Sequence, residues 1–390
     1  MAVGAPNADT DYVRDVLPAL IAALDAGPVA LARVISTTGA VPRAVGAAMA
    51  LTDTGEIIGS LSGGCVESAV IETASQVLAE PFATIEHFGF ADPDGIEIGL
   101  TCGGEMEVFV EKLSAADLPA LNRLAQAVAE GTPAAWATTL TQTPARHLAV
   151  GEPTVGNSAV GEPAVGAPRQ PFYRLDGDIA DLLSTGRSGI IGIDDCENDD
   201  HADSPRARPR TFVQTLAPRS RLILVGANDF VRALAELGAT LGYRVSVVDA
   251  RPVFATPARF PAADEVIVEW PDRYLEREIA TGNTSATTCV CVMTHDAKFD
   301  VPTLRIALAA KEIGFVGALG SRRTVAERKT RLQAAGVGPT EMARLRSPLG
   351  LDLGGHTPAE VAVSIAAQLI ADRHDASGES LTLRSGPIHR

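Results

Sequence analysis

The last third of the chain alternates short apolar runs with helical patterns, and this alternation limits the fold more than any other feature. The runs are RLILVGA (221–227), RVSVVDA (244–250), EVIVEW (265–270), CVCVMT (289–294) and FVGALG (315–320). Continuous apolar strands separated by helices are typical of a parallel sheet that is covered on both faces. We therefore predict a Rossmann-like, doubly wound parallel-sheet domain over residues 218–375, followed by a tail at 376–390.

Two details support this pattern. Cys289 and Cys291 are two residues apart in one apolar strand, so both point to the same face and are expected in the core. The last helix, 357–373, begins with a capping signal, in which Thr357 is the N-cap and Glu360 follows three residues later.

Residues 1–193 follow a different pattern and predict an α+β domain with an antiparallel or mixed sheet. Apolar residues at helical spacing predict helices at 11–25, 66–80 and 114–131. Strands are expected at 29–36, 83–90, 105–113, 134–142 and 171–177, with a hairpin at 48–62. The whole chain is thus expected in the α/β class, with this domain ahead of the Rossmann-like one.

Two segments depart from ordinary globular sequence. Residues 149–168 repeat a five-residue unit four times, AVGEP-TVGNS-AVGEP-AVGAP, and the Gly and Pro in each unit break helices and strands alike. We expect a flexible insertion there, between strands at 134–142 and 171–177. Residues 194–217 contain an acidic stretch and then a basic one with few apolar residues, which predicts a linker between the two domains.

Charge and cysteine content exclude several classes of protein. The net charge of −15 argues against nucleic-acid binding and against binding to anionic membranes, because both need a basic face. The first residues do not resemble a signal peptide, and no apolar run is long enough for a membrane span. The five cysteines are scattered and odd in number, unlike a disulfide framework, so we expect a cytoplasmic protein.

The stretch GSLSGGCVES (59–68) places Cys65 where a strand ends and a helix begins. A helix N-terminus stabilises a thiolate, and Ser62, Gly63 and Gly64 are expected to leave backbone N–H groups open to an anionic ligand. The stretch GLTCGGEME (99–107) mirrors it with Cys102. The spacing does not fit a zinc site; two buried free cysteines and a sulfur-handling or soft-metal pair both remain open.

In the Rossmann-like domain, VGANDFV begins like a dinucleotide fingerprint. Gly226 matches the first glycine, but Asn228 and Val231 replace the other two. Asp249 ends the second strand, where a ribose hydroxyl is bound in such folds. These residues are compatible with two alternatives: a βαβ turn that binds no nucleotide, and an NAD(P) site.

Other polar groups follow the later strands. His295 and Asp296 lie at the carboxyl end of the strand 289–294, where they either bind a ligand or form a solvated loop. Asp352 belongs to the Gly-rich loop 347–355. It is expected to be buried and to line the ligand crevice at the carboxyl ends of these strands.

The stretch FVGALGSRRT (315–324) predicts an anion site. Gly317 and Gly320 make a tight turn, Ser321 follows, and Arg322 and Arg323 stand near a helix start. Backbone N–H groups and arginine forks favour phosphate there. The alternative is an ordinary solvated helix start.

Together these motifs resemble the XdhC/CoxI family, accessory proteins for molybdenum hydroxylases such as xanthine dehydrogenase and aerobic carbon monoxide dehydrogenase. The resemblance rests on five motifs in order: GSLSGGCVESAV, GLTCGGEMEVFVE, VMTHDAKFDVPTL, FVGALGSRRT and SPLGLDLGGHTPAEVAVSI. It covers about 20–115 and 210–373 and leaves out the repeat and the linker.

The resemblance implies that the chain binds the molybdenum cofactor, a pterin with a dithiolene and a terminal phosphate, as cargo. It implies that a cysteine desulfurase supplies a terminal sulfur to the metal and that the cofactor then passes to an apo-molybdenum hydroxylase. In this interpretation Cys65 and Cys102 bind the molybdenum–sulfur end, Arg322 and Arg323 hold the phosphate, and Arg43 helps to balance charge. The chain is then a maturation factor more than an enzyme, and we expect a homodimer.

Two alternatives remain from the residues alone. An NAD(P)-dependent oxidoreductase would use the Rossmann-like domain, with His295 or Cys65 as the acid. A thiol-redox protein or metallochaperone would use Cys65 and Cys102 and leave the C-terminal sheet unexplained. The candidate ligand-binding residues are Arg43, Ser62, Gly63, Gly64, Gly226, Asp249, His295, Asp296, Gly317, Gly320, Ser321, Arg322, Arg323 and Asp352, with Cys65 and Cys102 as candidate molybdenum ligands.

Overall fold

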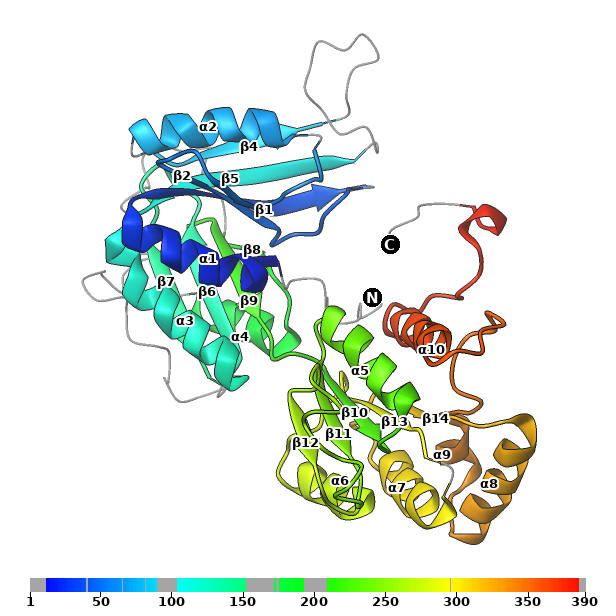
Figure 1. Ribbon diagram of the computed structural model, residues 1–390. Helices are drawn as coiled ribbons and strands as arrows, with labels where there is room; N and C mark the ends of the chain where they lie inside the picture. The colour runs from blue at the N-terminus through cyan, green and yellow to red at the C-terminus, as the bar shows by residue number, and fades with distance from the viewer. Residues whose placement is uncertain are drawn as a thin grey trace. The chain divides into compact units, whose positions relative to one another are not determined.

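The computed structural model describes residues 12–39, 41–64, 66–80, 82–89, 104–151, 172, 175–192, 209–294 and 296–385. They form two compact units, one made of the residues up to Pro218 together with Ser385 and the other running from Arg219 to Arg384 (Figure 1). Each unit has hydrophobic clusters of its own. Among the described residues, no helix is both long enough and apolar enough to cross a bilayer.

The first unit contains a five-stranded sheet in the order β3-β2-β1-β5-β4, with antiparallel pairing throughout. Its strands are β1 (Val29–Thr38), β2 (Ala48–Thr52), β3 (Ile57–Gly59), β4 (Thr84–Phe88) and β5 (Glu105–Leu113). Helix α2 (Glu67–Ala79) packs on one face through Val70, Ala74 and Val77 (Figure 1). The expected hairpin at 48–62 is confirmed, since β2 and β3 pair across the turn at 53–56.

Helices α1 (Tyr12–Ala26) and α3 (Leu118–Glu130) contribute to a second core of the same unit. Leu17 and Leu20 of α1 and Leu121 and Leu124 of α3 are buried there against strand residues. The predicted end of α3 at Gly131 is confirmed, because Gly131 is its C-cap in the left-handed conformation (φ 69°).

A four-stranded antiparallel sheet completes the first unit, in the order β7-β6-β9-β8. Its strands are β6 (Ala134–Thr139), β7 (Arg146–Val150), β8 (Gly189–Ile191) and β9 (Thr211–Leu216), and α4 (Asp176–Thr185) packs on one face. Side chains alternate between faces: Ala135 and Ala137 meet α4, whereas Ala134 and Trp136 join the core of α1 and α3.

This sheet corrects three sequence expectations. The expectation of a strand at 171–177 is wrong, because Asp176 and Gly177 begin helix α4. The strand that follows β6 in the chain is β7, which the sequence analysis does not expect, and the first two residues of the pentapeptide repeat, 149 and 150, belong to it; residues 152–168 are outside the described part. Residues 211–216, expected in the linker, form the inner strand β9 between β6 and β8.

The second unit has a six-stranded parallel sheet in the order β12-β11-β10-β13-β14-β15. Its strands are β10 (Arg221–Val225), β11 (Arg244–Val248), β12 (Glu265–Ile267), β13 (Cys289–Val292), β14 (Phe315–Ala318) and β15 (Leu345–Arg346). Numbered along the chain, this order is 3-2-1-4-5-6, the arrangement of a doubly wound dinucleotide fold. The order reverses between β10 and β13, which places the topological switch point there.

Helices cover both faces of this sheet (Figure 1). One face packs on α5 (Asp229–Thr240) and α10 (Pro358–Arg373), and the other on α6 (Pro271–Ala280), α7 (Ala297–Ala309) and α8 (Arg322–Ala334); the short α9 (Pro339–Ala343) follows. Cys289 and Cys291 lie together in the α5 and α10 core, as their spacing predicts. The N-terminal α+β arrangement and the Rossmann-like sheet are thus both confirmed.

The capping signal of the last helix is also confirmed. Thr357 Oγ1 accepts the N–H of Glu360 at 3.3 Å, and the Glu360 carboxylate accepts the N–H groups of Thr357 and His356 at 2.9 Å. These bonds satisfy N–H groups that a helix start leaves without an intrahelical partner.

Candidate functional site

The turn before α2 carries the residues on either side of Cys65. Gly63 and Gly64 adopt positive φ angles of 82° and 126°, which a side chain would disfavour. Apart from chain neighbours, no heavy atom of the described residues lies within 4 Å of a Cβ built on either glycine, so their requirement is conformational. Such a backbone turns successive N–H groups toward one point and forms a concave anion-binding nest.

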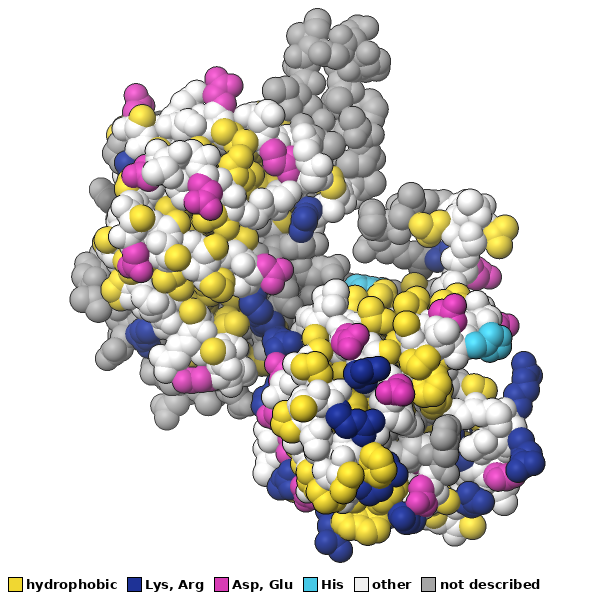
Figure 2. All heavy atoms as spheres, viewed as in Figure 1, with side chains coloured by type: hydrophobic (Ala, Val, Ile, Leu, Met, Phe, Trp, Pro, Cys, Tyr) yellow, Lys and Arg dark blue, Asp and Glu magenta, His cyan; other side chains and the backbone are white. Residues whose placement is uncertain are grey.

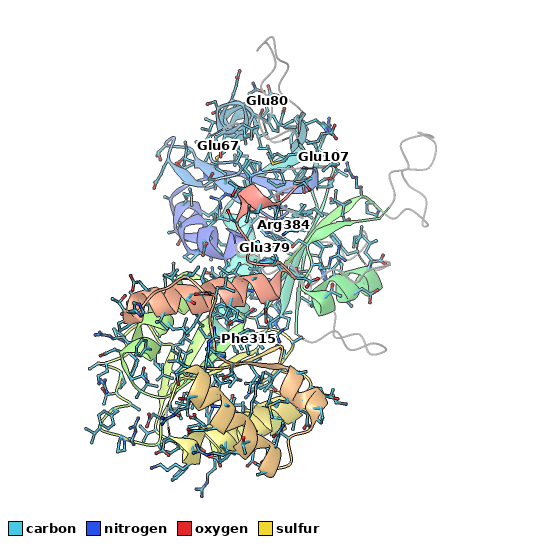
Figure 3. The ribbon with its side chains drawn as sticks, turned by 90° about the vertical axis from the view of Figure 1, so that its right-hand side faces the viewer. Glu67, Glu80, Glu107, Phe315, Glu379 and Arg384 are labelled. Carbon is cyan, nitrogen blue, oxygen red and sulfur yellow. The ribbon has the colours of Figure 1, made fainter. Side chains whose placement is uncertain are left out.

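The carboxylate of Glu67, in the first turn of α2, occupies this nest (Figure 3 labels Glu67). Glu67 Oε1 accepts the N–H groups of Ser62 and Gly63 at 2.8 Å, and Oε2 accepts the N–H of Gly64 at 2.8 Å. The hydroxyl of Ser60 donates to Oε1 at 2.9 Å, and the hydroxyl of Ser62 donates to Oε2. The N–H of Val66 lies 3.3 Å from Oε2.

This network corrects the expectation of open N–H donors at residues 62–64. The donors are already bound, and the anion that binds them belongs to the protein itself. Partial burial acts to raise the pKa of Glu67, but the hydrogen bonds from Ser62 and Ser60 outweigh it, so the pKa is well below that of an ordinary glutamate. Sequence analysis missed Glu67, although an acid in the first helical turn after Gly-Gly was its visible signal.

Three of the candidate residues lie outside the described part of the chain: Cys65, Cys102 and His295. Arg43 is half-buried in the loop between β1 and β2. Among the described residues, no group of three or more His, Cys, Asp or Glu side chains is placed to hold a metal ion.

At the switch point of the second unit, Gly226 follows β10 with a φ of 119°. A Cβ there would lie 2.9 Å from Cγ2 of Thr294, so glycine lets the β10 turn approach the end of β13. Asn228, which replaces the second glycine of the fingerprint, is the N-cap of α5. Its side chain accepts the N–H of Val231 at 3.1 Å and donates to the carbonyl of Met293 at 2.9 Å.

Asp249 lies at the end of β11 as expected, and it is buried. Arg251 donates to both of its carboxylate oxygens: the backbone N–H and Nε reach Oδ1 at 2.9 Å, and Nη2 reaches Oδ2 at 2.7 Å. The side-chain hydrogen bond to Asp249 raises the pKa of Arg251. The acid that binds ribose in a nucleotide site is therefore engaged by an arginine in this protein.

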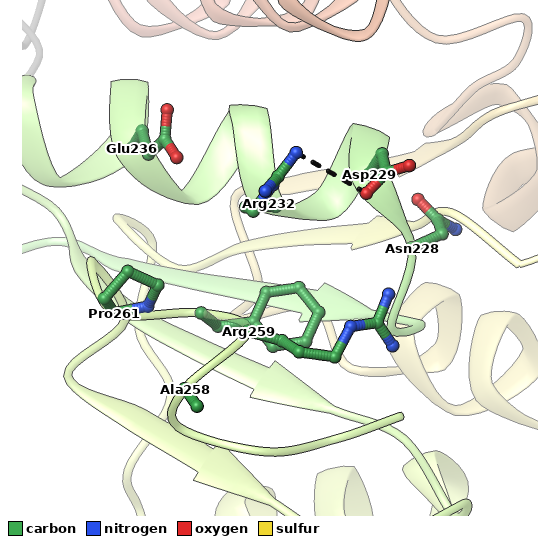
Figure 4. Close-up of a pocket in the computed structure, with 8 residues that line it drawn as sticks. Asn228, Asp229, Arg232, Glu236, Ala258, Arg259 and Pro261 are labelled. Carbon is green, nitrogen blue, oxygen red and sulfur yellow. Dashed lines mark ion pairs between the residues drawn. The ribbon is translucent and has the colours of Figure 1, made fainter. Parts of the chain in front are cut away.

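A pocket of about 250 Å³ lies between α5 and the segment 258–261 (Figure 4). Arg232 and Arg259 bring positive charge to it, and Asp229 and Glu236 bring negative charge. Arg232 pairs with Asp229 at 3.6 Å on the helix side, and Arg259 lies across the pocket from α5 (Figure 4). The pocket flanks the N-terminus of α5, where a doubly wound fold binds the phosphates of its ligand.

The turn at 317–323 differs in part from its expected form. Gly317 lies within β14, where a Cβ would come 2.4 Å from Leu349, so its role is packing. Ser321 is the N-cap of α8 and accepts the N–H of Thr324 at 3.3 Å. Arg322 is exposed, and the Arg323 side chain, 89% exposed, pairs with Glu327 at 3.3 Å.

The remaining candidates are Asp296, Gly320 and Asp352, which follow strands of the same sheet. Asp296 is exposed, caps α7 and pairs with Lys298 at 3.1 Å. Gly320 precedes Ser321, and a Cβ there would lie 3.3 Å from Thr324. Asp352 is exposed, so the expectation of a buried acid is wrong; its loop leaves it in solvent while the neighbouring Leu349 packs inward.

Figure 2 shows one face of the molecule, on which Lys and Arg side chains of the second unit lie among acidic and hydrophobic ones. This mixture is unlike the continuous basic stripe of a nucleic-acid-binding face.

Comparison with known families matches both units. A family model described as the XdhC and CoxI family matches residues 23–89, and one described as the XdhC Rossmann domain matches residues 222–369. The first match contains the turn before α2, and the second contains the switch point and the pocket.

Relatives of known name match over most of the chain. A protein of Bacillus subtilis (strain 168), named as a probable subunit of xanthine dehydrogenase, is 27% identical over 345 residues, which is 88% of this chain and 92% of the relative. The molybdenum cofactor insertion chaperone PaoD of Escherichia coli (strain K12) is 25% identical over 367 residues, 93% of this chain and 90% of the relative. A crystal structure described as a xanthine dehydrogenase from Bacillus halodurans has a TM-score of 0.68 and 25% identity, and the match covers 94% of this chain and 98% of that one.

Proposed function

The chain belongs to the XdhC and CoxI family, and from that premise we propose that it binds the molybdenum cofactor and delivers it to a molybdenum hydroxylase of the xanthine dehydrogenase type. The observation that carries the proposal is the likeness to PaoD, which is named a molybdenum cofactor insertion chaperone and aligns over both units of this chain. The turn before α2 supports it, because its backbone is held in place on both sides of Cys65.

In this proposal Cys65 and Cys102 receive the molybdenum–sulfur end of the cofactor. Thiolates are soft ligands and suit such a centre better than carboxylates do. Arg322 and Arg323 are the proposed partners of the phosphate, because exposed arginines at a helix start are able to reorient toward an anion. The finer steps belong to the same proposal: sulfur supplied by a cysteine desulfurase, and a homodimeric accessory protein.

The test is anaerobic mixing of the purified full chain with the molybdenum cofactor, followed by gel filtration and metal analysis of the protein peak. We expect roughly stoichiometric molybdenum, lost in Cys65→Ser and in Cys102→Ser and reduced in Arg322→Ala/Arg323→Ala. Cys196→Ser serves as the matched cysteine control and should retain the metal. If the wild-type protein retains no molybdenum with its cysteines reduced, the proposal fails.

The pocket beside α5 favours one second candidate, an NAD(P)-dependent oxidoreductase. The pocket lies where this fold binds a nucleotide phosphate, and Arg259 and Arg232 line it. Arg251 binds the Asp249 carboxylate, which in other nucleotide sites accepts a ribose hydroxyl. A nucleotide with an extra phosphate near the ribose would therefore fit this edge better than one whose ribose needs that carboxylate. Titration with NADPH and NADH separates the candidates, since tight saturable binding of NADPH would favour the oxidoreductase.

A further inference from the structure

The anion nest before α2 is complete without any ligand. A carboxylate has two oxygens and about four lone-pair positions. The N–H groups of Ser62, Gly63 and Gly64 and the hydroxyls of Ser60 and Ser62 all point to the Glu67 carboxylate. These donors carry the positive partial charge of the nest. Because they all bind the Glu67 carboxylate, the centre of the nest carries a negative charge.

The same carboxylate connects the two sides of Cys65. Gly64 precedes Cys65 and Val66 follows it, and the N–H groups of both are directed to Glu67 Oε2, at 2.8 Å and 3.3 Å. Ser62 also accepts the N–H of Val66 through its hydroxyl, at 3.2 Å. Hydrogen bonds to an ionised acceptor are about twice as strong as neutral ones, so this contact restrains the backbone next to the cysteine.

A second oxyanion at this turn would meet a carboxylate instead of free donors. Phosphate, sulfate or molybdate would have to displace Glu67, and the displaced carboxylate would then remain beside it as a like charge. A group that binds the cysteine sulfur directly needs none of these N–H donors, so it does not have to displace Glu67. The turn therefore discriminates between the two ends of a ligand that carries a phosphate at one end and sulfur or metal at the other.

We propose that Glu67 is a positioning and specificity-determining residue: it holds the turn around Cys65 in shape and excludes oxyanions from it. Its consequence for ligand orientation rests on the proposed function, because it assigns the sulfur and metal end of the cofactor to this turn and the phosphate elsewhere. The positioning and exclusion themselves are properties of the protein alone, and they are testable with inorganic anions.

The experiment is hydrogen exchange of the backbone amides at 61–64 and 66 in the full-length protein, with and without inorganic phosphate or acetate. In the wild-type protein we expect slow exchange that neither anion changes. In Glu67→Ala we expect exchange of these amides to rise by about tenfold or more, since several charge-assisted hydrogen bonds are lost. Added phosphate or acetate should then restore protection in a saturable way, because the emptied nest becomes an anion site.

Glu72→Ala is the matched control, since Glu72 is an exposed carboxylate on the same helix. It should exchange like the wild type and show no response to anions. Glu67→Gln keeps the shape of the side chain but places an NH₂ group among donors, so it should give intermediate exchange and weak rescue. This variant keeps the test decisive if Glu67→Ala does not fold.

Two results would overturn the proposal. One is saturable protection of the wild-type turn by phosphate, which would make the nest an oxyanion site that Glu67 vacates. The other is unchanged exchange in both Glu67 variants, which would show that the carboxylate does not hold the turn. Since no cofactor is used, failure here is distinct from a failure to retain molybdenum.

Discussion

Asp300 of α7 and Arg328 of α8 form a buried ion pair, with 2.9 Å between Oδ2 and Nη2. The pair makes further hydrogen bonds: Thr294 donates to the other oxygen of Asp300, and Arg328 donates to Ser347 Oγ at 3.1 Å and to the carbonyl of Leu319 at 2.9 Å. These residues connect the ends of β13 and β14 to α7 and α8, the helices that follow them. Candidate residues of the second unit lie at the same ends of these strands.

Removal of one partner of this pair should lower the stability of the fold, because the other charge stays buried without its counter-charge. We expect Arg328→Met to lower the free energy of unfolding of the second unit by about 3–5 kcal/mol. The double variant Asp300→Asn/Arg328→Met should lose less than the sum of the single variants. Urea unfolding followed by Trp270 fluorescence in a Trp136→Phe background measures this, since Trp270 is then the sole tryptophan. Additive losses would contradict the coupling.

Gly226→Ala tests the close approach at the switch point. The positive φ and the 2.9 Å contact with Thr294 Cγ2 predict a loss of about 1–3 kcal/mol in stability. Adding Thr294→Ser to Gly226→Ala removes Cγ2 and should restore part of the lost stability. Gly282→Ala is the control, because Gly282 has a φ of 72° with open space around it and so reports strain without the clash. Equal losses for the two glycine variants, measured by thermal unfolding, would rule out the steric contribution.

The capping box of α10 should make stability depend on pH. Backbone hydrogen bonds from Thr357 and His356 lower the pKa of Glu360 to about 2. Because the folded pKa is depressed, the stabilisation is present above the ordinary pKa of about 4.5 and is lost as the pH falls toward 2. We expect Glu360→Gln to flatten the dependence of the melting temperature on pH between about 4.5 and 2 relative to wild type. Parallel curves for the two proteins would contradict this assignment.

Arg259→Ala tests the pocket beside α5. If the pocket holds a nucleotide phosphate, removal of this arginine should weaken binding of NADPH by about 10–100-fold, as expected for one charge-assisted hydrogen bond. Arg273→Ala, a substitution on α6 away from the pocket, is the control and should bind like wild type. Isothermal titration measures both, and equal affinities would remove Arg259 from the site.

Much of this fold follows from local pattern. Continuous apolar runs separated by helical patterns predict the parallel strands and their helices, because a strand buried on both faces is apolar throughout. The two-residue spacing of Cys289 and Cys291 placed both in one core, and Thr357 with Glu360 predicted the start of α10. These features depend on backbone geometry over a few residues, which the sequence displays directly.

The candidate sites depended on partners that pattern alone does not assign. The backbone N–H groups of Ser62 to Gly64 are expected from the sequence to be open to a ligand, but their acceptor is Glu67 of the same chain. Asp249 was rightly placed at the end of β11, but Arg251 engages it. A hydrogen-bonding group is equally able to bind a ligand or a neighbour, and only its position in the folded chain decides which.

The sequence by itself determined the two kinds of domain, the core faces and the helix caps, because the repeat of apolar residues and the capping residues act locally. Tertiary structure alone decided the pairing of β9 with β6, the Arg33–Glu111 bond across 78 residues and the Asp300–Arg328 pair across 28. Buried charges are stable only when paired, and the partner is brought there by the packing of distant segments.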